Sequence, residues 1–406
     1  MAPIFLIAGL FIYIFACRAA MRSLAGPPRE AVMAVLNVSG LYLFLFKGHN
    51  ENYLARFVLY LLLVGFQYAV LRLFATRKGW LPWLAFFTPI AALIVVRYIP
   101  GPAYVALGHA LKKNWRGAPD MVGISYLAFR CSRLVLEVRN GAVKTPSFLQ
   151  YLHFSFFLPT MPVGPINSYE NYRRGFEETP YAVPVGRAAL RILVGAVKYL
   201  FLGNLCNQLG YANLLLNDHP HQWIDLPVAM LFYYLYLYCN FSGFCDIAIG
   251  AAALIGIPVP ENFENPFAAR NIRDFWNRWH ITLSLYMRDV VFAPLSKYLV
   301  RVTGPAFADH AIAITIAIVF LLVGIWHGLG WNFVAYGAVH ALGVVANHYY
   351  TIWLKKRLGR DRFKAYNANP WIRAVAVVLT FCYCAASLIF FANTFPQIHQ
   401  ILSMLR

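Results

Sequence analysis

Long apolar stretches, separated by short polar ones, follow one another along most of the chain. At 1.5 Å per helical residue, several are long enough to cross a hydrocarbon core of about 30 Å. Others are shorter or contain Gly and Pro, which a bilayer tolerates only where protein or a water-filled cavity covers the backbone. The pattern predicts an all-α, polytopic integral membrane protein with about 11 membrane-embedded segments. These are residues 4–15, 31–46, 57–74, 80–96, 121–138, 148–163, 188–202, 226–257, 311–326, 331–345 and 371–392.

The composition indicates the same class. Of the 406 residues, 60% are hydrophobic and 13% are charged, which leaves too little polar surface to cover a soluble globule of this length. The opening stretch lacks the basic start and the small-residue cleavage site of a secretory signal, so we interpret it as the first span. Because the sequence has no clear internal repeat and no low-complexity tract, we predict a single membrane domain over residues 1–406.

The excess of basic residues bears on orientation. The sequence has 35 Lys and Arg against 16 Asp and Glu, a formal net charge of +19, and in membrane proteins such an excess gathers in the cytoplasmic loops. Three clusters of basic residues are candidates for cytoplasmic loops, and this assignment places the N-terminus outside the cell. They are Arg18, Arg22 and Arg29; Arg77 and Lys78; and Lys355, Lys356, Arg357, Arg360, Arg362 and Lys364.

Simple alternation also places Lys112, Lys113 and Arg116 outside, against the same rule, unless one nearby segment fails to cross. The orientation of segment 98–119 therefore stays open. A basic inner face would in addition attract an acidic protein or ligand, since clustered charge raises encounter rates with the opposite charge.

Segment 270–301 places basic, amide, histidine and aromatic residues between strongly apolar spans. At 100° per residue, its polar side chains fall within about 80° of one another and its large apolar ones lie opposite, which predicts an in-plane amphipathic helix. The polar face holds Arg273, Asn277, His280, Ser284 and Arg288, and the other holds Phe275, Trp279, Leu283, Tyr286 and Val290. Such a helix either anchors in the interface or lines a cavity. We favour the cavity, because Asn, His and Ser beside arginines can orient a polar or anionic substrate.

His327 follows 16 residues without a charge and precedes Gly328 and Gly330. A titratable group in a bilayer is costly, so it indicates function. Imidazole can take a proton from a hydroxyl nucleophile near neutral pH and return one to a leaving group. Trp326 and Trp331 would wall this site or mark the depth of the interface.

Two further polar residues allow two interpretations each. His340 is either a second lining residue or a packing residue, and we favour packing. Asp246, inside a long apolar segment, is either a proton or substrate ligand or the partner of a buried arginine, and we favour the partner. The chain shows no phosphate loop, HExxH or paired zinc spacing, and its seven Cys lie mostly in apolar segments, so we expect no bound cofactor and no metal.

Several motifs resemble the membrane-bound O-acyltransferase superfamily, in its bacterial branch, most strongly over 121–392. They are GISYLAFR (123–130), LPTMPVGPI (158–166), NFSGFCDIAIG (240–250), ENFENPF (261–267), FWNRWHITLSLYMRD (275–289) and GIWHGLGWNFVAYGAVH (324–340). The resemblance implies a ring of helices around a thin central partition. It also implies that His327 is the catalytic residue and that His280 is its companion.

Within the branch, GISYLAFR, AVKYLFLG (196–203), FWNRWH and AYGAVHALGVVAN (335–347) are similar to the D-alanyl transferase of the Dlt system, whereas FSGFCDIAIG resembles alginate-type O-acetylation proteins. The first similarity implies a multi-pass enzyme of the cell membrane that takes D-alanine from a phosphopantetheine thioester. An acidic carrier protein would present the thioester on the cytoplasmic face. The product would pass to an extracytoplasmic hydroxyl acceptor or a relay acyltransferase for modification of a cell-envelope polymer, with no nucleic acid involved.

The expected mechanism makes His327 the general base on the attacking hydroxyl. His280 or Asn277 would stabilise the oxyanion or orient the acceptor. The substrate-binding set that we expect is Asn277, Trp276, Ser284, Arg288 and Trp326. One alternative is O-acetyl transfer for an exported polysaccharide. A second is a proton-coupled secondary transporter in which His280, Asp246 and His327 form a proton relay.

Overall fold

The structure is a computed structural model that describes residues 3–46, 53–98, 121, 123–178, 183–216 and 221–405. The described chain is helical, and its strand pairing is limited to two isolated bridges, so the all-α prediction is confirmed. Two compact units are present, Met1–Gly195 with Phe244–Pro260 and Ala196–Gly243 with Glu261–Arg406. We describe each by itself as the first and the second unit. The single domain over 1–406 and the ring around a central partition stay predictions.

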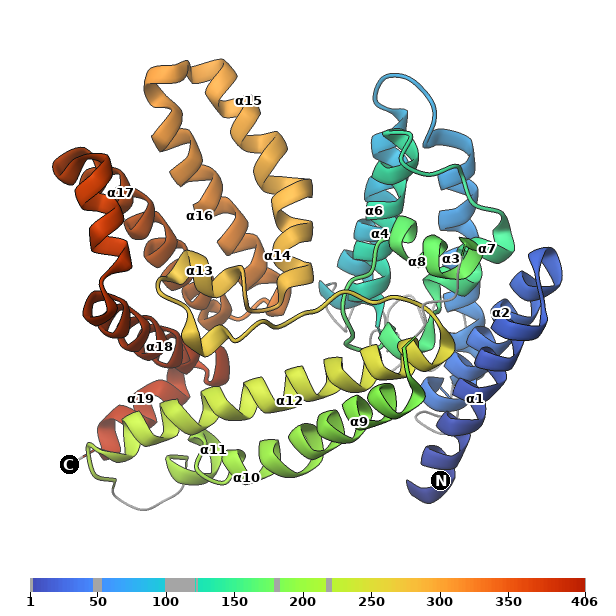
Figure 1. Ribbon diagram of the computed structural model, residues 1–406, viewed down its shortest axis with the longest axis horizontal. Coiled ribbons are helices and arrows are strands. Elements are labelled where there is room, and N and C mark those ends of the chain that lie inside the picture. The colour runs from blue at the N-terminus through green and yellow to red at the C-terminus, as the bar shows by residue number, and fades with distance from the viewer. Residues whose placement is uncertain are drawn as a thin grey trace, which may run out of the picture. The chain divides into compact units, whose positions relative to one another are not determined.

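The first unit contains the N-terminal helices and the C-terminal part of α12 (Figure 1). Its elements are α1 (Pro3–Ser23), α2 (Gly26–Leu41), η1 (Tyr42–Phe46), α3 (Tyr53–Phe74), α4 (Leu81–Tyr98), α6 (Ile124–Arg139), α7 (Phe148–Ser155), η2 (Leu158–Thr160), α8 (Tyr169–Arg173), η3 (Arg174–Glu178), α9 (Val185–Ala196) and the second part of α12 (Asp225–Ile255).

The second unit contains the first part of α12 and the C-terminal helices. Its other elements are η4 (Val197–Leu202), α10 (Gly203–Asn207), α11 (Tyr211–Leu214), η5 (Pro266–Ala268), α13 (Ile272–Trp276), α14 (Ile281–Met287), η6 (Arg288–Phe292), α15 (Ala293–Thr303), η7 (Pro305–Phe307), α16 (Ala308–His327), α17 (Trp331–Ala368), α18 (Pro370–Ala392) and α19 (Phe395–Met404).

Seven helices in the described part are long and apolar enough to cross a membrane. They are Gly26–Phe46, Tyr53–Phe74, Leu81–Tyr98, Val185–Leu214, Asp225–Ile255, Pro305–His327 and Pro370–Ala392. The polytopic prediction is confirmed, but the count of about 11 is not. Segment 148–163 forms the eight-residue helix α7 and a short 3₁₀ turn, and α6 in segment 121–138 is largely buried inside the protein. Residues 99–120, on which the orientation conflict falls, lie outside the described residues.

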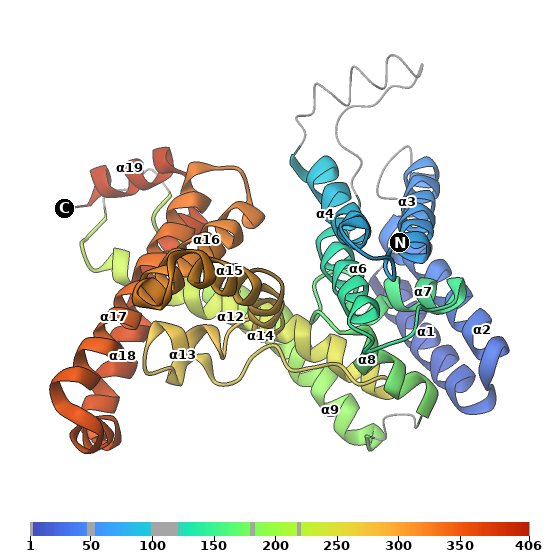
Figure 2. The ribbon, with the colours of Figure 1, turned by 90° about the horizontal axis from the view of Figure 1, so that it is seen from above.

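A buried arginine links α6 to the following loop in the first unit, where α6 lies beside α4 (Figure 2). Arg130 is 1% exposed. Its guanidinium donates to the carbonyl oxygens of Phe154 (2.9 Å), Ser155 (3.3 Å) and Thr160 (3.2 Å) and to the Thr160 hydroxyl (2.7 Å). The motifs GISYLAFR and LPTMPVGPI are therefore joined by one side chain that uses backbone oxygens instead of a carboxylate.

The interpretation of Asp246 as the partner of an arginine is confirmed. Its carboxylate on α12 lies 3.0 Å from the Arg191 guanidinium on α9, and both side chains are partly buried. Because an isolated charge within an apolar span would be expensive, the pair removes the need for Asp246 to bind a proton or a substrate.

Glycines set the packing of α16 against α17, which lie side by side (Figure 1). A Cβ on Gly324 would lie 2.4 Å from the carbonyl oxygen of Phe333, and one on Gly337 would lie 2.5 Å from that of Phe320. Both distances are shorter than any side chain tolerates, so only glycine allows the two backbones to approach this closely. This contact fixes the end of α16, where His327 lies.

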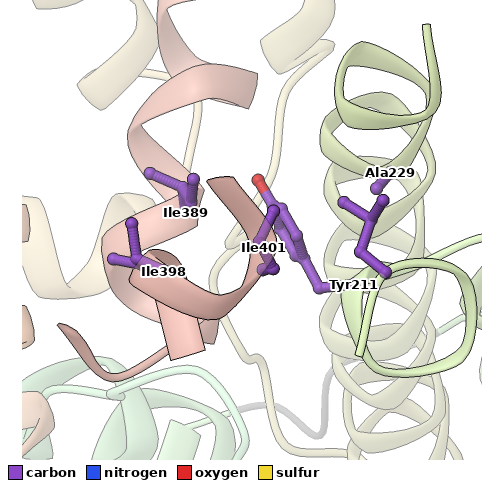
Figure 3. Close-up of a cluster of buried hydrophobic side chains, with 6 residues drawn as sticks. Tyr211, Ala229, Ile389, Ile398 and Ile401 are labelled. Atoms are coloured by element: carbon purple, nitrogen blue, oxygen red, sulfur yellow. The ribbon is translucent and has the colours of Figure 1, made fainter. Parts of the chain in front are cut away.

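The last helix, α19, covers a small apolar cluster of the second unit (Figure 3). Ile398 and Ile401 of α19 pack with Ile389 of α18, Tyr211 of α11 and Ala229 of α12. Fully burying such aliphatic side chains stabilises a fold by about 1.5–3 kcal/mol each. The cluster therefore holds α18 beside the N-terminal part of α12.

The predicted continuous amphipathic helix through 273–288 is wrong. α13 ends at Trp276, α14 begins at Ile281, and Trp279 pairs with Phe263 in an isolated antiparallel bridge. The Ile281 N–H donates to the Asn262 carbonyl at 3.0 Å. Hydrogen bonds to a segment distant in the sequence replace those of the helix, so the predicted polar line is divided in two.

Candidate active site

His280 lies in this break with an unusual backbone. Its φ of 46° is left-handed, a conformation that costs a residue other than glycine about 1–2 kcal/mol. The surrounding hydrogen bonds hold it there and leave the side chain 4% exposed. The break therefore places an imidazole in the interior of the second unit that a continuous helix would have directed elsewhere.

Asn262 determines which nitrogen of His280 carries the proton. Its side-chain oxygen lies 3.1 Å from His280 Nδ1 and also accepts hydrogen bonds from the Thr282 N–H (3.2 Å) and hydroxyl (2.9 Å). Since an amide oxygen only accepts, neutral His280 carries its proton on Nδ1 and keeps the lone pair on Nε2. Nε2 is buried and bonds to no residue that the structure describes.

The environment of His280 keeps its ring neutral. It lies between α13 and α14, outside the seven spans. Burial, with a smaller contribution from repulsion by His327, lowers the pKa of His280 to about 3. At neutral pH the side chain is therefore a hydrogen-bond acceptor at Nε2 and carries no charge.

His327 ends α16 and is partly exposed. Its ring centre lies 4.8 Å from that of Phe391 in an edge-on contact and 6.0 Å from that of Tyr336. Trp326 lies beside both histidines, with ring centres 4.6 Å from His327 and 6.2 Å from His280. The structure thus brings together three of the predicted site residues, Trp326, His327 and His280, within aromatic walls.

His340 has a structural role, as the packing interpretation expected. It is 1% exposed. Its Nδ1 accepts from Trp276 Nε1 (3.2 Å), and its Nε2 lies 3.0 Å from the Ser387 hydroxyl. Indole N–H only donates, so neutral His340 carries its proton on Nε2 and donates to Ser387, whose hydroxyl donates to the Cys384 carbonyl at 2.7 Å. Both ring nitrogens are therefore used within the protein.

The other predicted binding residues line a separate cavity of about 450 Å³ between α14, α16 and neighbouring elements. Trp276, Asn277, Ser284 and Arg288 belong to its lining together with Arg273 and His348, and most of the rest of its wall is aliphatic, including Ile312, Ile316, Val319 and Val323. We call it the apolar cavity. Among the described residues, neither His280 nor His327 belongs to its lining.

Sequence reasoning missed the residues that orient the histidines. Asn262 lies in the motif ENFENPF, but without a partner in view it had no assigned role. Ser387, Tyr336 and Phe391 come from ordinary apolar spans. Only their proximity in the folded chain distinguishes them from packing residues.

A family model described as MBOAT, membrane-bound O-acyltransferase family, matches residues 121–389, which include His280, His327 and Asn262. The chain belongs to this family. As a membrane-bound O-acyltransferase, it is a multi-pass membrane enzyme, and the prediction of an acyltransferase is confirmed over that of a transporter.

Relatives of this membrane-bound O-acyltransferase carry two kinds of name. The chain is 32% identical over 294 residues to the teichoic acid D-alanyltransferase of Streptococcus thermophilus, covering 68% of each chain. It is 31% identical to the protein of the same name from Bacillus subtilis, over 69% of this chain and 71% of that one. It is 28% identical to a probable alginate O-acetylase of Azotobacter vinelandii, over 54% of this chain and 42% of that one.

Proposed function

We propose that this enzyme transfers D-alanine from a phosphopantetheine thioester on a carrier protein to a hydroxyl group outside the membrane. The similarity to two teichoic acid D-alanyltransferases over about two thirds of the chain supports this donor. In the reaction, the hydroxyl oxygen attacks the thioester carbonyl and loses its proton. The C–S bond breaks, and the carrier thiol leaves with a proton.

The observation that supports the mechanism best is the arrangement of His280, Trp326 and His327. His327 acts as the general base, because its imidazole is partly exposed and lies at the end of a span that is otherwise uncharged. His280 presents a lone pair at Nε2, which accepts a hydrogen bond from a second hydroxyl of the acceptor molecule, because the attacking hydroxyl gives its one proton to His327. We therefore assign His280 to orienting the acceptor. Neutral His280 has no free N–H to donate, so other hydrogen-bond donors stabilise the oxyanion.

The apolar cavity supports a binding role for the remaining predicted residues. Asn277, Ser284 and Arg288, with Arg273 and His348, form a polar edge on a mainly aliphatic pocket to which Trp276 adds its ring, the usual composition of a small-molecule site. In the proposed function this pocket accommodates the pantetheine arm. No bound cofactor is required, because the donor arrives already attached to its carrier.

O-acetyl transfer is the alternative for the same site, and it is supported by the similarity to an alginate O-acetylase over about half of the chain. The two donors differ by one amino group and one carbon in the acyl group. The purified enzyme would be given carrier protein loaded with labelled D-alanine or with labelled acetate, and the label in a hydroxyl acceptor would be measured.

We expect D-alanyl transfer to exceed acetyl transfer by at least about tenfold, a difference of about 1.4 kcal/mol in transition-state binding. A preference for acetate would replace D-alanine with the alternative donor. Absence of transfer from either carrier in well-folded protein would reject the carrier thioester as the donor.

A further inference from the structure

A second cavity, of about 590 Å³, lies in the second unit between α13, the C-terminal half of α17 and the start of α18. Its wall is rich in guanidinium, amide and phenol groups, and we call it the polar cavity. It is lined by Arg270, Asn271, Arg273, Asp274, Asn277, Arg278, Asn347, Tyr350, Thr351, Leu354, Phe363, Tyr366, Asn367, Ile372, Arg373 and Ala376. Arg273 and Asn277 also line the apolar cavity, so these two residues form a shared wall.

The positive charge of the polar cavity is mostly uncompensated. Asp274 is the one acidic residue among the described lining residues, and it pairs with Arg278 at 2.9 Å. The guanidinium groups of Arg270, Arg273 and Arg373 form no hydrogen bond or ion pair with any residue that the structure describes. Three exposed arginines without an acidic partner give this pocket a positive potential, which favours an anionic ligand.

The arginines of the polar cavity favour an anion that accepts several hydrogen bonds. A guanidinium offers five donors in a planar fork that matches phosphate oxygens. The side chain of Asn277 and the paired hydroxyls of Tyr350 and Tyr366, 3.0 Å apart, add neutral polar groups to the wall. A phosphate ester suits this lining better than a lone carboxylate, which would leave most of the donors unused.

The wall also argues against a phospholipid. Its apolar members are Leu354, Phe363, Ile372 and Ala376, too few to hold acyl chains, whereas the apolar cavity beyond the shared wall is mainly aliphatic. A ligand that fits both cavities has a phosphate at one end and a thin, uncharged arm at the other.

We propose that the polar cavity binds the phosphodiester of the incoming donor, and that the uncharged arm passes Arg273 and Asn277 into the apolar cavity. The proposal rests on the donor of the proposed function and adds the residues that hold its phosphate. Arg373 lines only the polar cavity and is exposed, which makes it the cleanest residue to change.

The test compares two thioester donors carrying the same acyl group, one on the carrier phosphopantetheine and one on N-acetylcysteamine, which has no phosphate. Arg373→Gln and Arg273→Gln should each raise the KM for the carrier donor about tenfold, the loss of one charge-assisted hydrogen bond. For Arg373→Gln, which does not line the apolar cavity, the KM for the phosphate-free donor should stay within about twofold. Arg187→Gln, an exposed charge on α9 far from this lining in the sequence, is the matched control.

A second measurement does not depend on transfer. Free phosphopantetheine should bind the wild-type enzyme and the Arg187→Gln variant equally and bind Arg373→Gln about tenfold more weakly. Equal effects of Arg373→Gln on both donors, or unchanged binding of phosphopantetheine, would overturn the phosphate site. So would a loss that appears only in vesicles containing anionic lipid, which would assign the cavity to a lipid headgroup. Failure of the wild-type enzyme to use either donor, with phosphopantetheine still bound, would reject the proposed function alone.

Discussion

Three histidines in the second unit differ in what their nitrogens can still bind. His340 uses both ring nitrogens, one toward Trp276 and one toward Ser387, so it cannot take a proton at Nδ1 without breaking the Trp276 bond. His280 keeps Nε2 available but has a strongly lowered pKa. His327 is the partly exposed one of the three. The proposed roles of base, hydrogen-bond acceptor and packing residue therefore follow from these hydrogen bonds and from the exposure of His327.

The general-base role makes a direct prediction for His327. His327→Ala should lower the rate of acyl transfer by at least about 100-fold, because the hydroxyl loses its proton acceptor, while donor binding and thermal stability stay close to wild type. Transfer of labelled acyl group and a melting curve in detergent would be measured on the same purified sample. Near-normal turnover in a well-folded variant would remove His327 from the mechanism.

The candidate site residues could be predicted from the sequence better than the neighbours that position them. His327 and His280 could be selected from the sequence because titratable groups between apolar spans are rare. Asn262 could not, since its importance depends on Thr282 and on a backbone turn about 20 residues away. The local pattern is enough to select the histidines, whereas the residue that orients His280 is recognised only from tertiary contacts.

At the scale of elements, periodicity was reliable for the long spans and unreliable for segment 270–301. A helical wheel assumes one continuous helix, whereas pairing of Trp279 with Phe263 interrupts it. The count of about 11 segments stays a prediction beside the seven long apolar helices of the described residues. α6 is apolar enough to be counted, but it is short and contains Arg130, and its apolar face packs against protein.

The close contact of α16 with α17 predicts a large effect from one methyl group. Gly337→Ala should destabilise the protein by about 1–3 kcal/mol, because the new Cβ would meet the Phe320 carbonyl and force the helices apart. Gly65→Ala in α3 is the control, since a Cβ there meets no atom within 4 Å. Thermal melting in detergent should show a lower Tm for Gly337→Ala and no decrease for Gly65→Ala. Equal melting of both variants would contradict the close contact.

At the scale of the whole molecule, the net positive charge can serve partner binding as well as membrane orientation. Lys355, Lys356 and Arg357 are exposed on α17, in the same helix as residues of the polar cavity. An acidic carrier protein would be attracted by this cluster and would dock more slowly at high salt.

Changing Lys355, Lys356 and Arg357 together to Glu should therefore raise the KM for the carrier donor and leave the maximal rate unchanged. Raised salt should weaken docking to the wild-type enzyme in the same way and should have little effect on the variant. Steady-state transfer at several salt concentrations would be measured. A reduced maximal rate with unaltered carrier affinity would argue against docking at this cluster.

Arg130 also has a consequence for how the protein is made. Its four hydrogen-bond acceptors lie in residues 154–160, which leave the ribosome after α6 does. A charged arginine at the centre of a newly inserted helix costs about 2.5–3.5 kcal/mol until it finds partners. Helix α6 should therefore wait at the insertion machinery or the bilayer surface until the loop after α7 has been synthesised. Helix α6 and residues 154–160 should then integrate into the membrane together, at a time set by the translation of residues 154–160.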